Sequence, residues 1–452
     1  MALIRCPLQS AARRWGDAIA IDGEHTLTYL ELDARVTGLC HDLRKQGVGN
    51  GSHLGYCAGN QLEAILLIYA CFRLGAVFVP LSTRFPAQQQ QQLIDELNIQ
   101  FGYPELPGTK AIMVLANEGE QLWQFDGDLP ATMVLTSGSS GSPKAAVHNV
   151  LQHLAAAEGS FDQTPLTIGD RWLLSLPLYH IGGMAILFRC LLSGATVVLP
   201  RQKDAEACLA EQQITHVSMV ATQLQRLLQQ PTAAAQLASV KVLLLGGSAI
   251  PAKLVEQLQS YSLLALTSYG MTEMGSQITT GAANSQGLAG LPLAGRQIRI
   301  DQDGVIEVRG DSRFLGYYQH GKLQQPFDKD GWFHTKDRGQ WVGEQLKVLG
   351  RADNMFISGG ENVQPEAIEA VISQVEGVNQ VMVVAIADDE FGQLPVAVID
   401  GDYQQTAVEK RLNKKLPRFM RPRHYLSWPI DLQSSGIKVS RQAIQQYAAA
   451  QL

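Results

Sequence analysis

A run of glycine and hydroxyl side chains, closed by a lysine, lies between two apolar segments. Glycine lets the backbone approach an anion closely, hydroxyl and amide groups donate hydrogen bonds to it, and lysine adds positive charge. The run is not a Walker A loop, because it lacks Gly-Lys-Ser/Thr at the required spacing. Composition alone also allows an ordinary loop, but the order, with Pro-Lys at the end, indicates an anion-binding loop. Its candidate residues are Thr136, Ser137, Gly138, Ser139, Ser140, Gly141 and Lys144.

Two other apolar runs end in residues that could contact a ligand. Residues 241–245 precede Gly246 and Gly247, and residues 263–267 precede the sequence Ser-Tyr-Gly-Met-Thr-Glu. An ordinary strand-to-helix turn explains the glycine pair equally well, and the Thr-Glu pair could simply open a helix. However, Ser137, Gly246 and Ser268 all lie just past expected strand ends, where open α/β sheets bind ligands. The candidate residues of the second run are Ser268, Tyr269, Gly270, Thr272 and Glu273.

The elements expected to position these residues alternate between strand and helix from about residue 132 to 270. Such alternation predicts βαβ units and a mostly parallel sheet covered by helices. The anion-binding run is expected to follow a strand and to precede a helix that begins near Asn149. The first hundred residues repeat this style. The expected strands are 53–57, 76–79, 133–135, 195–199, 216–220, 241–245 and 263–267, and the expected helices are 28–45, 60–73, 204–213 and 222–229.

The pattern changes in the last third of the chain. Period-2 alternation about Asp303-Gly304 predicts an antiparallel hairpin. Beyond Arg351, residues 381–387 and 395–399 are expected to pair as strands, within a compact α+β unit. The predicted fold class is therefore α/β: a large N-terminal part with mostly parallel sheets covered by helices and a small antiparallel β portion, then a small mobile α+β domain. We expect the domains to span 1–350, with a β-rich section at 281–350, and 351–452.

Composition excludes several classes of protein. The 452 residues carry a formal charge of -6 and no basic run, so nothing indicates nucleic-acid binding. The six cysteines form no CxxC pair, which favours reduced thiols in a cytoplasmic protein. The apolar window 62–81 is interrupted by Glu63 and Arg73 and reads as a helix followed by a strand, not a membrane span. A homo-oligomer remains possible at this stage.

Five segments, in order, resemble the motifs of the adenylate-forming superfamily, which includes acyl- and aryl-CoA ligases, peptide-synthetase adenylation domains and luciferases. The segments are 136–144, 268–273, 330–337, 350–369 and 437–441. The resemblance implies ATP, Mg²⁺ and CoA as cofactor, metal and co-substrate. It also implies nucleotide-binding roles: the 136–144 loop on phosphate, Thr272 on the α-phosphate and Glu273 on Mg²⁺. Tyr269 would stack on adenine, and Gly246 and Gly247 would let adenine or the substrate approach.

The same resemblance implies roles for residues nearer the C-terminus. Asp337 and Arg351 would hold the ribose, although either alone is more often a surface charge. Lys438 would be the catalytic lysine, despite an isoleucine inserted after Gly436 where the family commonly has Gly-Lys. Asp353 would be the hinge. The glycine-rich stretch Ser358, Gly359 and Gly360 would form part of the CoA channel.

A finer resemblance is to the o-succinylbenzoate–CoA ligase branch of the superfamily, an enzyme of menaquinone biosynthesis. It is carried by LLSLPLYHIGG, LLLGGSAIP, DNMFISGGENVQPE, EFGQLPVAV and GIKVSRQA. It implies a two-step reaction, in which the acid is adenylated by ATP and then transferred to CoA, with o-succinylbenzoate as the acid. The alternatives are another acyl- or aryl-CoA ligase, a carrier-protein thiol as acceptor, or a nucleotide-binding sensor without catalysis.

The predicted acyl pocket combines residues from several of these segments. His180 would line or gate it, although a lone histidine is usually structural. Arg189 lies in an apolar stretch, where a charge is costly unless paired, so it should meet a carboxylate of the protein or of the substrate. The predicted substrate residues are His180, Arg189, Ser218, Ser268 and Gly270.

Overall fold

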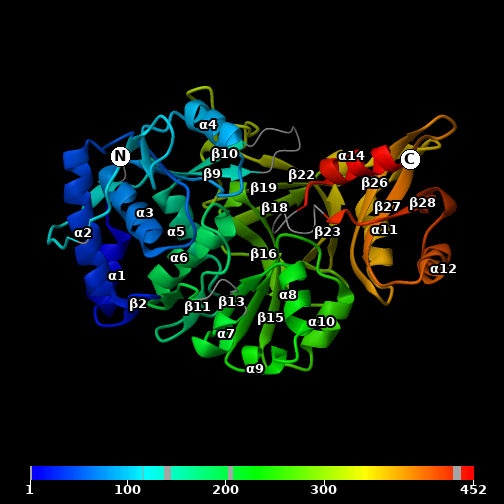
Figure 1. The fold of residues 1–452 in the computed structure, drawn as a ribbon, viewed down its shortest axis with the longest axis horizontal. Helices are drawn as coiled ribbons and strands as arrows, with labels where there is room; N and C mark the ends of the chain where they lie inside the picture. The colour runs from blue at the N-terminus through cyan, green and yellow to red at the C-terminus, as the bar shows by residue number, and fades with distance from the viewer. Residues whose placement is uncertain (1–2, 116, 137–143, 202–206, 431–438) are drawn as a thin grey trace.

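The computed structural model describes residues 3–115, 117–136, 144–201, 207–430 and 439–452. Two mixed sheets and the helices between them build a large body, and a smaller α+β unit follows (Figure 1). This arrangement matches the predicted fold class. The position of the domain boundary at Arg351 remains a prediction.

The first sheet has eight strands in the order β21-β20-β10-β9-β5-β4-β6-β7. Strands β9, β5, β4, β6 and β7 pair in parallel, while β10 pairs antiparallel with both β9 and β20. The antiparallel half therefore links the first third of the chain to residues near 317. The bounds are β4 (His53–Tyr56), β5 (Val77–Pro80), β6 (Phe101–Tyr103), β7 (Lys110–Ala111), β9 (Pro130–Thr136), β10 (Lys144–Asn149), β20 (Gly316–Gln319) and β21 (Lys322–Gln324).

The second sheet has nine strands in the order β17-β16-β15-β14-β13-β11-β12-β2-β3. Its six central strands, β15 to β2 in that order, run parallel, and the alternating pattern predicted four of them, β12, β13, β14 and β15. Their carboxyl ends consequently share one edge. The bounds are β2 (Ile19–Asp22), β3 (Leu27–Thr28), β11 (Arg171–Leu173), β12 (Thr196–Val198), β13 (His216–Met219), β14 (Val242–Leu245), β15 (Leu264–Met271), β16 (Ser276–Ala282) and β17 (Leu291–Pro292).

Helices α3 and α6 lie between the two sheets and are almost wholly buried, in one core with residues of both sheets. Gly75 caps the C-terminal end of helix α3, and its φ of +67° favours glycine. Strand β5 follows, so the 62–81 window is a helix, a turn and a strand. No described helix is long and apolar enough to cross a membrane. The helices of the large body are α1 (Pro7–Trp15), α2 (Tyr29–Gln46), α3 (Leu62–Leu74), α4 (Ala87–Glu96), α5 (Val150–Glu158), α6 (Ile181–Ser193), α7 (Cys208–Glu211), α8 (Ala221–Leu228), α9 (Ala233–Leu237) and α10 (Ala252–Leu258).

The segment after the anion-binding run differs from the prediction. A strand, β10, stands between the run and helix α5, and it pairs antiparallel with β9 so that Lys144 lies opposite Thr136. The run therefore joins two antiparallel strands and does not lead directly into a helix. Asn149 ends the strand and caps α5, with its side chain accepting the Gln152 N–H at 2.8 Å. The predicted helix 204–213 is also shorter in the described part of the chain, where α7 spans Cys208–Glu211.

A four-stranded antiparallel sheet, β18-β19-β22-β23, follows the two mixed sheets. The predicted hairpin at Asp303-Gly304 is confirmed: β18 and β19 pair antiparallel, and Gly304 has a φ of +77°. Strand β23 ends at Arg351, opposite Asp337 of β22. The bounds are β18 (Arg296–Ile300), β19 (Val305–Gly310), β22 (Phe333–Val342) and β23 (Gln345–Arg351), with β1 (Leu3–Arg5) and β8 (Gln124–Asp126) forming a separate pair.

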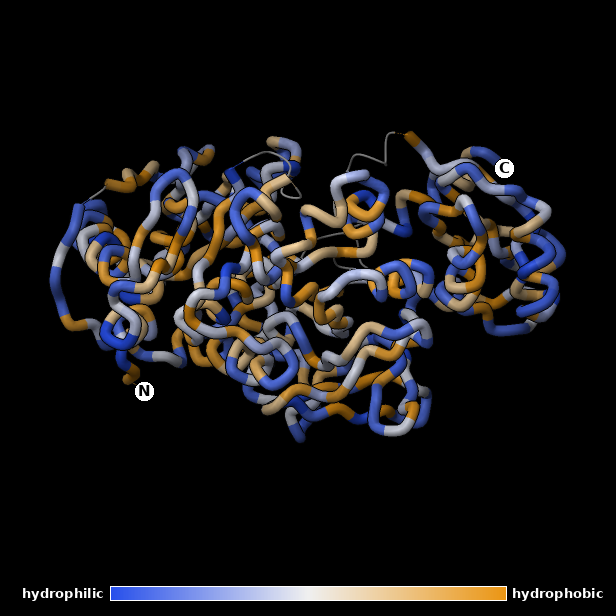
Figure 2. The backbone as a smooth tube through the Cα atoms, turned by 90° about the horizontal axis from the view of Figure 1, so that it is seen from below, coloured by the Kyte–Doolittle hydropathy of each residue, from blue (hydrophilic) through white to orange (hydrophobic). Residues whose placement is uncertain are grey.

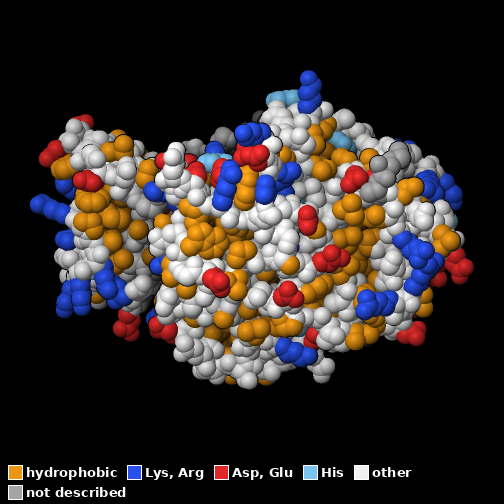
Figure 3. Space-filling view, turned by 180° about the vertical axis from the view of Figure 1, so that it is seen from behind, with side chains coloured by type: hydrophobic (Ala, Val, Ile, Leu, Met, Phe, Trp, Pro, Cys, Tyr) orange, Lys and Arg blue, Asp and Glu red, His pale blue; other side chains and the backbone are white. Residues whose placement is uncertain are grey.

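The C-terminal unit has two apolar clusters of its own, on the two faces of the sheet β26-β27-β28. Figure 2 shows it as a lobe with apolar strands inside, and Figure 3 shows it from behind, at the left of the large body. The predicted pairing of residues 381–387 with 395–399 is confirmed. The bounds are β24 (Phe356–Ser358), β25 (Glu361–Val363), α11 (Pro365–Ile372), β26 (Val378–Asp388), β27 (Gly392–Gly401), α12 (Gln405–Lys415), β28 (His424–Ser427) and α14 (Arg441–Gln451).

Candidate nucleotide and acyl site

The ends of β14 and β15 bring two of the predicted segments together. Leu245 pairs with Thr267 in parallel register, and Ser268 Oγ donates to the Leu245 carbonyl at 3.3 Å. A Cβ on Gly246 would lie 2.9 Å from Ser268 Oγ, so a larger residue there would displace the serine hydroxyl. Ser268 itself lies inside β15 and not past its end, because β15 continues beyond its pairing with β14 by pairing with β16. This corrects the expected strand end.

Gly270 is explained by its own backbone surroundings. The pairing of β15 with β16 shifts register between Tyr269 and Gly270, and a Cβ on Gly270 would lie 1.7 Å from the Ser276 carbonyl oxygen. Any side chain would therefore break the bulge. Tyr269 pairs with Thr279 on one side of the register shift, and Gly270 pairs with Gln277 on the other.

Three residues predicted to contact the nucleoside meet in one cluster. The Tyr269 hydroxyl donates to Asp337 Oδ2 at 2.8 Å, and Arg351 Nη1 lies 3.3 Å from Asp337 Oδ1. Arg351 also binds Asp353, the predicted hinge residue, through two hydrogen bonds of 2.9 Å. The Asp353 and Asp337 carboxylates raise the pKa of Arg351, and burial together with Asp337 raises the pKa of Tyr269. The predicted ribose and hinge residues thus form one charged network.

Glu273, the predicted Mg²⁺ ligand, lies in a 3-10 turn, Thr272–Met274, directly after β15. Its Oε1 accepts the Tyr317 hydroxyl at 2.6 Å, and the Lys144 ammonium lies 5.2 Å from the centroid of the same tyrosine ring. Burial raises the pKa of Glu273, an effect that the hydrogen bond from Tyr317 opposes. Tyr317 was not singled out from the sequence, since its partners lie 44 or more residues away and no local motif marks it.

A single carboxylate fits Mg²⁺ here. Among the described residues no three His, Cys, Asp or Glu side chains cluster as a metal-binding set. Mg²⁺ bound with a nucleotide takes one or two carboxylates, phosphate oxygens and water. Glu273 can supply the carboxylate, and the nucleotide would supply the phosphate oxygens.

Arg189 is buried inside the large body, and the side chains that it contacts are neutral. Its Nε donates to Ser160 Oγ at 3.2 Å, its Nη2 donates to Gln277 Oε1, and its guanidinium lies 5.3 Å from the centroid of the Trp172 ring. No described carboxylate forms an ion pair with it. Burial, followed by the charge of Arg296, lowers the pKa of Arg189 to about 10. Two partners were predicted for Arg189: a carboxylate of the protein or a carboxylate of the substrate. Among the described residues, the structure excludes the first.

The other predicted acyl-pocket residues lie on neighbouring elements. Ser218 is on β13, and its Oγ accepts the Trp172 indole N–H at 3.3 Å, which connects it to Arg189 through the Trp172 ring. His180 is exposed at the start of α6, with its ring edge-on to Tyr179 at 4.7 Å. The residues predicted to form the acyl pocket therefore lie on β13, on β15 and in or next to α6.

Asn60 holds the segment before His180 in place and was missed by sequence reasoning. Its Nδ2 donates to the carbonyls of Leu174 and Leu176, both at 2.9 Å, and its Oδ1 accepts the Leu178 N–H at 3.0 Å. One amide side chain thus binds three backbone groups of this segment.

The predicted C-terminal residues are only partly described. Ser358 ends β24, and Gly359 and Gly360 form the turn to β25, with φ of +57° and +86°. The Gly359 N–H donates to the Phe391 carbonyl at 2.9 Å. Lys438 and the loop residues Ser137, Gly138, Ser139, Ser140 and Gly141 lie outside the described residues. Three residues after Lys438, Arg441 anchors α14 by pairing with Glu369 at 2.6 Å and with Glu366 at 3.4 Å.

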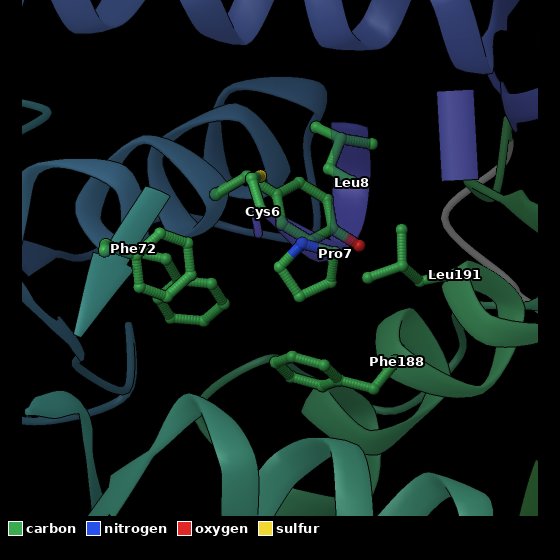
Figure 4. Close-up of a pocket in the computed structure, with 8 residues that line it drawn as sticks. Cys6, Pro7, Leu8, Phe72, Phe188 and Leu191 are labelled. Carbon is green, nitrogen blue, oxygen red and sulfur yellow. The ribbon is translucent and has the colours of Figure 1, made fainter. Parts of the chain in front are cut away.

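A small apolar pocket lies apart from these residues, between α1, α3 and α6 (Figure 4). Phe72 and Phe188 stack beside it with ring centroids 5.8 Å apart, and Cys6 is among the lining residues. None of the predicted site residues lines it, so we interpret it as a packing gap of the core.

Comparison with known proteins gives matches along nearly the whole chain. The AMP-binding enzyme family matches residues 8–318, and the AMP-binding enzyme C-terminal domain matches residues 367–436. The 2-succinylbenzoate–CoA ligase of Escherichia coli is 36% identical over 449 residues, covering 97% of this chain and 98% of the relative. A variant of E. coli MenE with bound OSB-AMS superposes with a TM-score of 0.89 at 35% identity, covering 99% and 98% of the two chains.

Bacillus subtilis o-succinylbenzoate CoA synthetase provides three complexes for comparison. The complex with OSB-AMP has a TM-score of 0.86 at 26% identity, with 98% and 99% coverage of this chain and that one. The complex with ATP and magnesium has 0.84 at 27%, with 94% and 96% coverage. A double mutant bound to the product analogue OSB-NCoA has 0.70 at 26%, with 94% and 95% coverage. On these matches, which span both parts of the fold, the chain belongs to the AMP-binding enzyme family.

Proposed function

We propose that the chain joins 2-succinylbenzoate to CoA, with ATP as the second substrate and an acyl-adenylate as intermediate, and releases AMP and pyrophosphate. This proposal rests on the cluster of Tyr269, Asp337, Arg351 and Glu273 near the end of β15. The chain that carries the cluster matches a 2-succinylbenzoate–CoA ligase over 97% of its length. ATP, Mg²⁺ and CoA follow as cofactor, metal and co-substrate. The pathway of this reaction is menaquinone biosynthesis.

The first half-reaction brings a carboxylate against the α-phosphate of ATP. At ~4 Å and an effective dielectric near 20, one such pair of like charges repels by about 4 kcal/mol. Lys144, the donors of the 136–144 loop and Lys438 would offset this repulsion, and Thr272 would bind the α-phosphate. When bound, Mg²⁺ neutralises phosphate charge and polarises the phosphorus for attack. Water has to be excluded, because it would hydrolyse the mixed anhydride.

The acid is held at its second carboxylate in this proposal. Arg189 is a buried guanidinium whose partners among the described residues are neutral, so an anionic group of the substrate would supply the missing charge, directly or through water. The succinyl carboxylate would then face the ATP, and the ring carboxylate would face Arg189. A fatty acid offers nothing to pair with this charge.

The second half-reaction would require the C-terminal unit to rotate about Asp353, withdrawing Lys438 and bringing the Ser358-Gly359-Gly360 turn to the acyl carbon. The two B. subtilis complexes support such a motion, since the same fold superposes at 0.86 with OSB-AMP bound and at 0.70 with OSB-NCoA bound. The arrangement described here is thus closer to the adenylate-bound form.

Asp353→Pro is expected to slow thioester formation at least tenfold while adenylation stays near normal. Asp353 lies in a 3-10 turn, whose φ proline can adopt, so the substitution fixes the present arrangement. Pre-steady-state rates of pyrophosphate release and of thioester formation check this. Asp353→Ala is the matched control, because it removes the ion pair with Arg351 without fixing φ. If proline and alanine slow the two steps alike, the pivot lies elsewhere.

Asn60→Asp is expected to raise the KM for the carboxylic acid about tenfold, with the KM for ATP changed less than about twofold. The substituted carboxylate would face the Leu174 and Leu176 carbonyl oxygens, which now receive hydrogen bonds, and such a loss is worth about 1–3 kcal/mol. Steady-state kinetics with each substrate varied in turn would check it. An equal rise in both KM values would contradict a role confined to the 174–178 segment.

Pyrophosphate exchange tests the reaction class. Labelled pyrophosphate should enter ATP only when the acid is present and CoA absent, as reversible adenylation requires. A nucleotide-binding sensor would give no exchange, and a kinase would release ADP.

A cytoplasmic location is also part of the proposal, since all six cysteines are free thiols, which a reducing compartment maintains. Homo-oligomer formation stays an untested prediction.

A further inference from the structure

Tyr317 stands between the two oppositely charged groups that the proposed reaction needs. Its hydroxyl donates to Glu273 Oε1 at 2.6 Å, and the ammonium of Lys144 lies 5.2 Å from the centroid of its ring. No ion pair between Lys144 and Glu273 is present among the described residues. The tyrosine contacts the lysine through the face of its ring and the glutamate through its hydroxyl, so one side chain interacts with both charged groups.

The strand that carries Tyr317 is held rigidly. Strand β20 pairs with β10 so that Tyr317 lies opposite Ala146, two residues from Lys144. The Phe314 N–H donates to the Glu273 carbonyl at 2.9 Å, and the buried Phe314 ring packs edge-on against Tyr317 at 4.8 Å. The loop lysine, the tyrosine and the glutamate therefore lie on three elements that are bonded to one another.

We propose that Tyr317 is a positioning residue for adenylation: it orients Glu273 toward Mg²⁺ and keeps Lys144 and Glu273 from neutralising each other. The inference rests on the proposed function, since it takes Glu273 as the metal ligand and Lys144 as a phosphate ligand. A direct ion pair would leave the carboxylate less available to the metal and the ammonium less available to the triphosphate. A cation held on an aromatic face keeps its charge and can still bind an anion.

The test measures metal binding without any acyl substrate. Mn²⁺ is titrated into protein saturated with α,β-methylene-ATP, and free Mn²⁺ is read by electron paramagnetic resonance. Tyr317→Phe keeps the ring and removes the hydroxyl; it should weaken Mn²⁺ binding about tenfold and leave metal-free analogue binding within twofold. Tyr317→Leu removes the ring as well and should also weaken metal-free analogue binding.

Tyr318→Phe is the matched control, because Tyr318 packs on the opposite face of β20 against His53, with ring centroids 5.4 Å apart. It should change neither constant. Wild-type Mn²⁺ affinity in Tyr317→Phe would overturn the inference. A double-mutant cycle with Glu273→Gln adds a second check: the effect of Tyr317→Phe on Mn²⁺ binding should vanish in that background, and a persisting tenfold loss would equally overturn it. Failure of the proposed function would show separately, as absent pyrophosphate exchange in the wild-type enzyme.

Discussion

Lys438→Ala is expected to slow formation of the acyl-adenylate by about 10²–10³-fold, the usual effect of losing one preorganised donor at a developing charge. The resemblance to the adenylate-forming superfamily implies that this lysine reaches the active site from the C-terminal domain and meets the negative charge that builds on the phosphate. Single-turnover pyrophosphate release measures the effect. The second half-reaction needs no such group, so synthetic acyl-adenylate plus CoA should give thioester at close to the wild-type rate.

Lys410→Ala is the matched control for this result, since Lys410 is an exposed lysine on α12 of the same C-terminal unit. It should leave both half-reactions unchanged. If Lys438→Ala retains full pyrophosphate release, or if it slows both half-reactions alike, the assignment of the catalytic lysine is wrong.

Arg189→Met is expected to lower kcat/KM for 2-succinylbenzoate by about 10²-fold, because the ring carboxylate would lose its charged partner in a buried site. The same substitution should change kcat/KM for 4-phenyl-4-oxobutanoate, which lacks that carboxylate, by less than about threefold. The contrast between the two acids in one AMP-release assay is the measurement. Equal losses for both would show that Arg189 serves packing and not recognition.

The unliganded Arg189→Met protein should melt no lower than the wild type. Burial disfavours the charged guanidinium, as its lowered pKa of about 10 shows, and no described carboxylate compensates it. Replacing a buried charge by an apolar side chain of similar size is often neutral or stabilising. A loss of activity together with unchanged or higher stability would mark Arg189 as a residue retained for its function.

The sequence was sufficient to predict strands β12, β13, β14 and β15 of the second sheet, because strand and helix alternate there with clear turn residues between them. It failed after the anion-binding run, where β10 was read as the approach to a helix. Residues 145–147 are all buried, and a short, continuous apolar run does not distinguish a covered strand from the start of a helix. Ser268 was misplaced for a related reason: β15 exchanges one partner strand for another without a break.

The site residues also divide into those that the sequence predicted and those that it did not. Tyr269, Asp337 and Arg351 were found through motifs, and the structure brings them within hydrogen-bond distance across 68 and 14 residues of chain. Tyr317 and Asn60 carry no motif, and their partners lie 44 and 114 to 118 residues away. Such positioning residues depend on tertiary contacts alone, so only the folded structure identifies them.

The most direct measurement of the proposed activity is CoA-dependent AMP release by the wild-type enzyme with three acids in parallel: 2-succinylbenzoate, 4-phenyl-4-oxobutanoate and a medium-chain fatty acid. We expect 2-succinylbenzoate to be used with the highest kcat/KM, by about tenfold or more over the analogue without the ring carboxylate, with AMP and CoA thioester formed in equal amounts. Use of the analogue as well as 2-succinylbenzoate, or a preference for the fatty acid over both, would contradict the substrate assignment and with it the role given to Arg189.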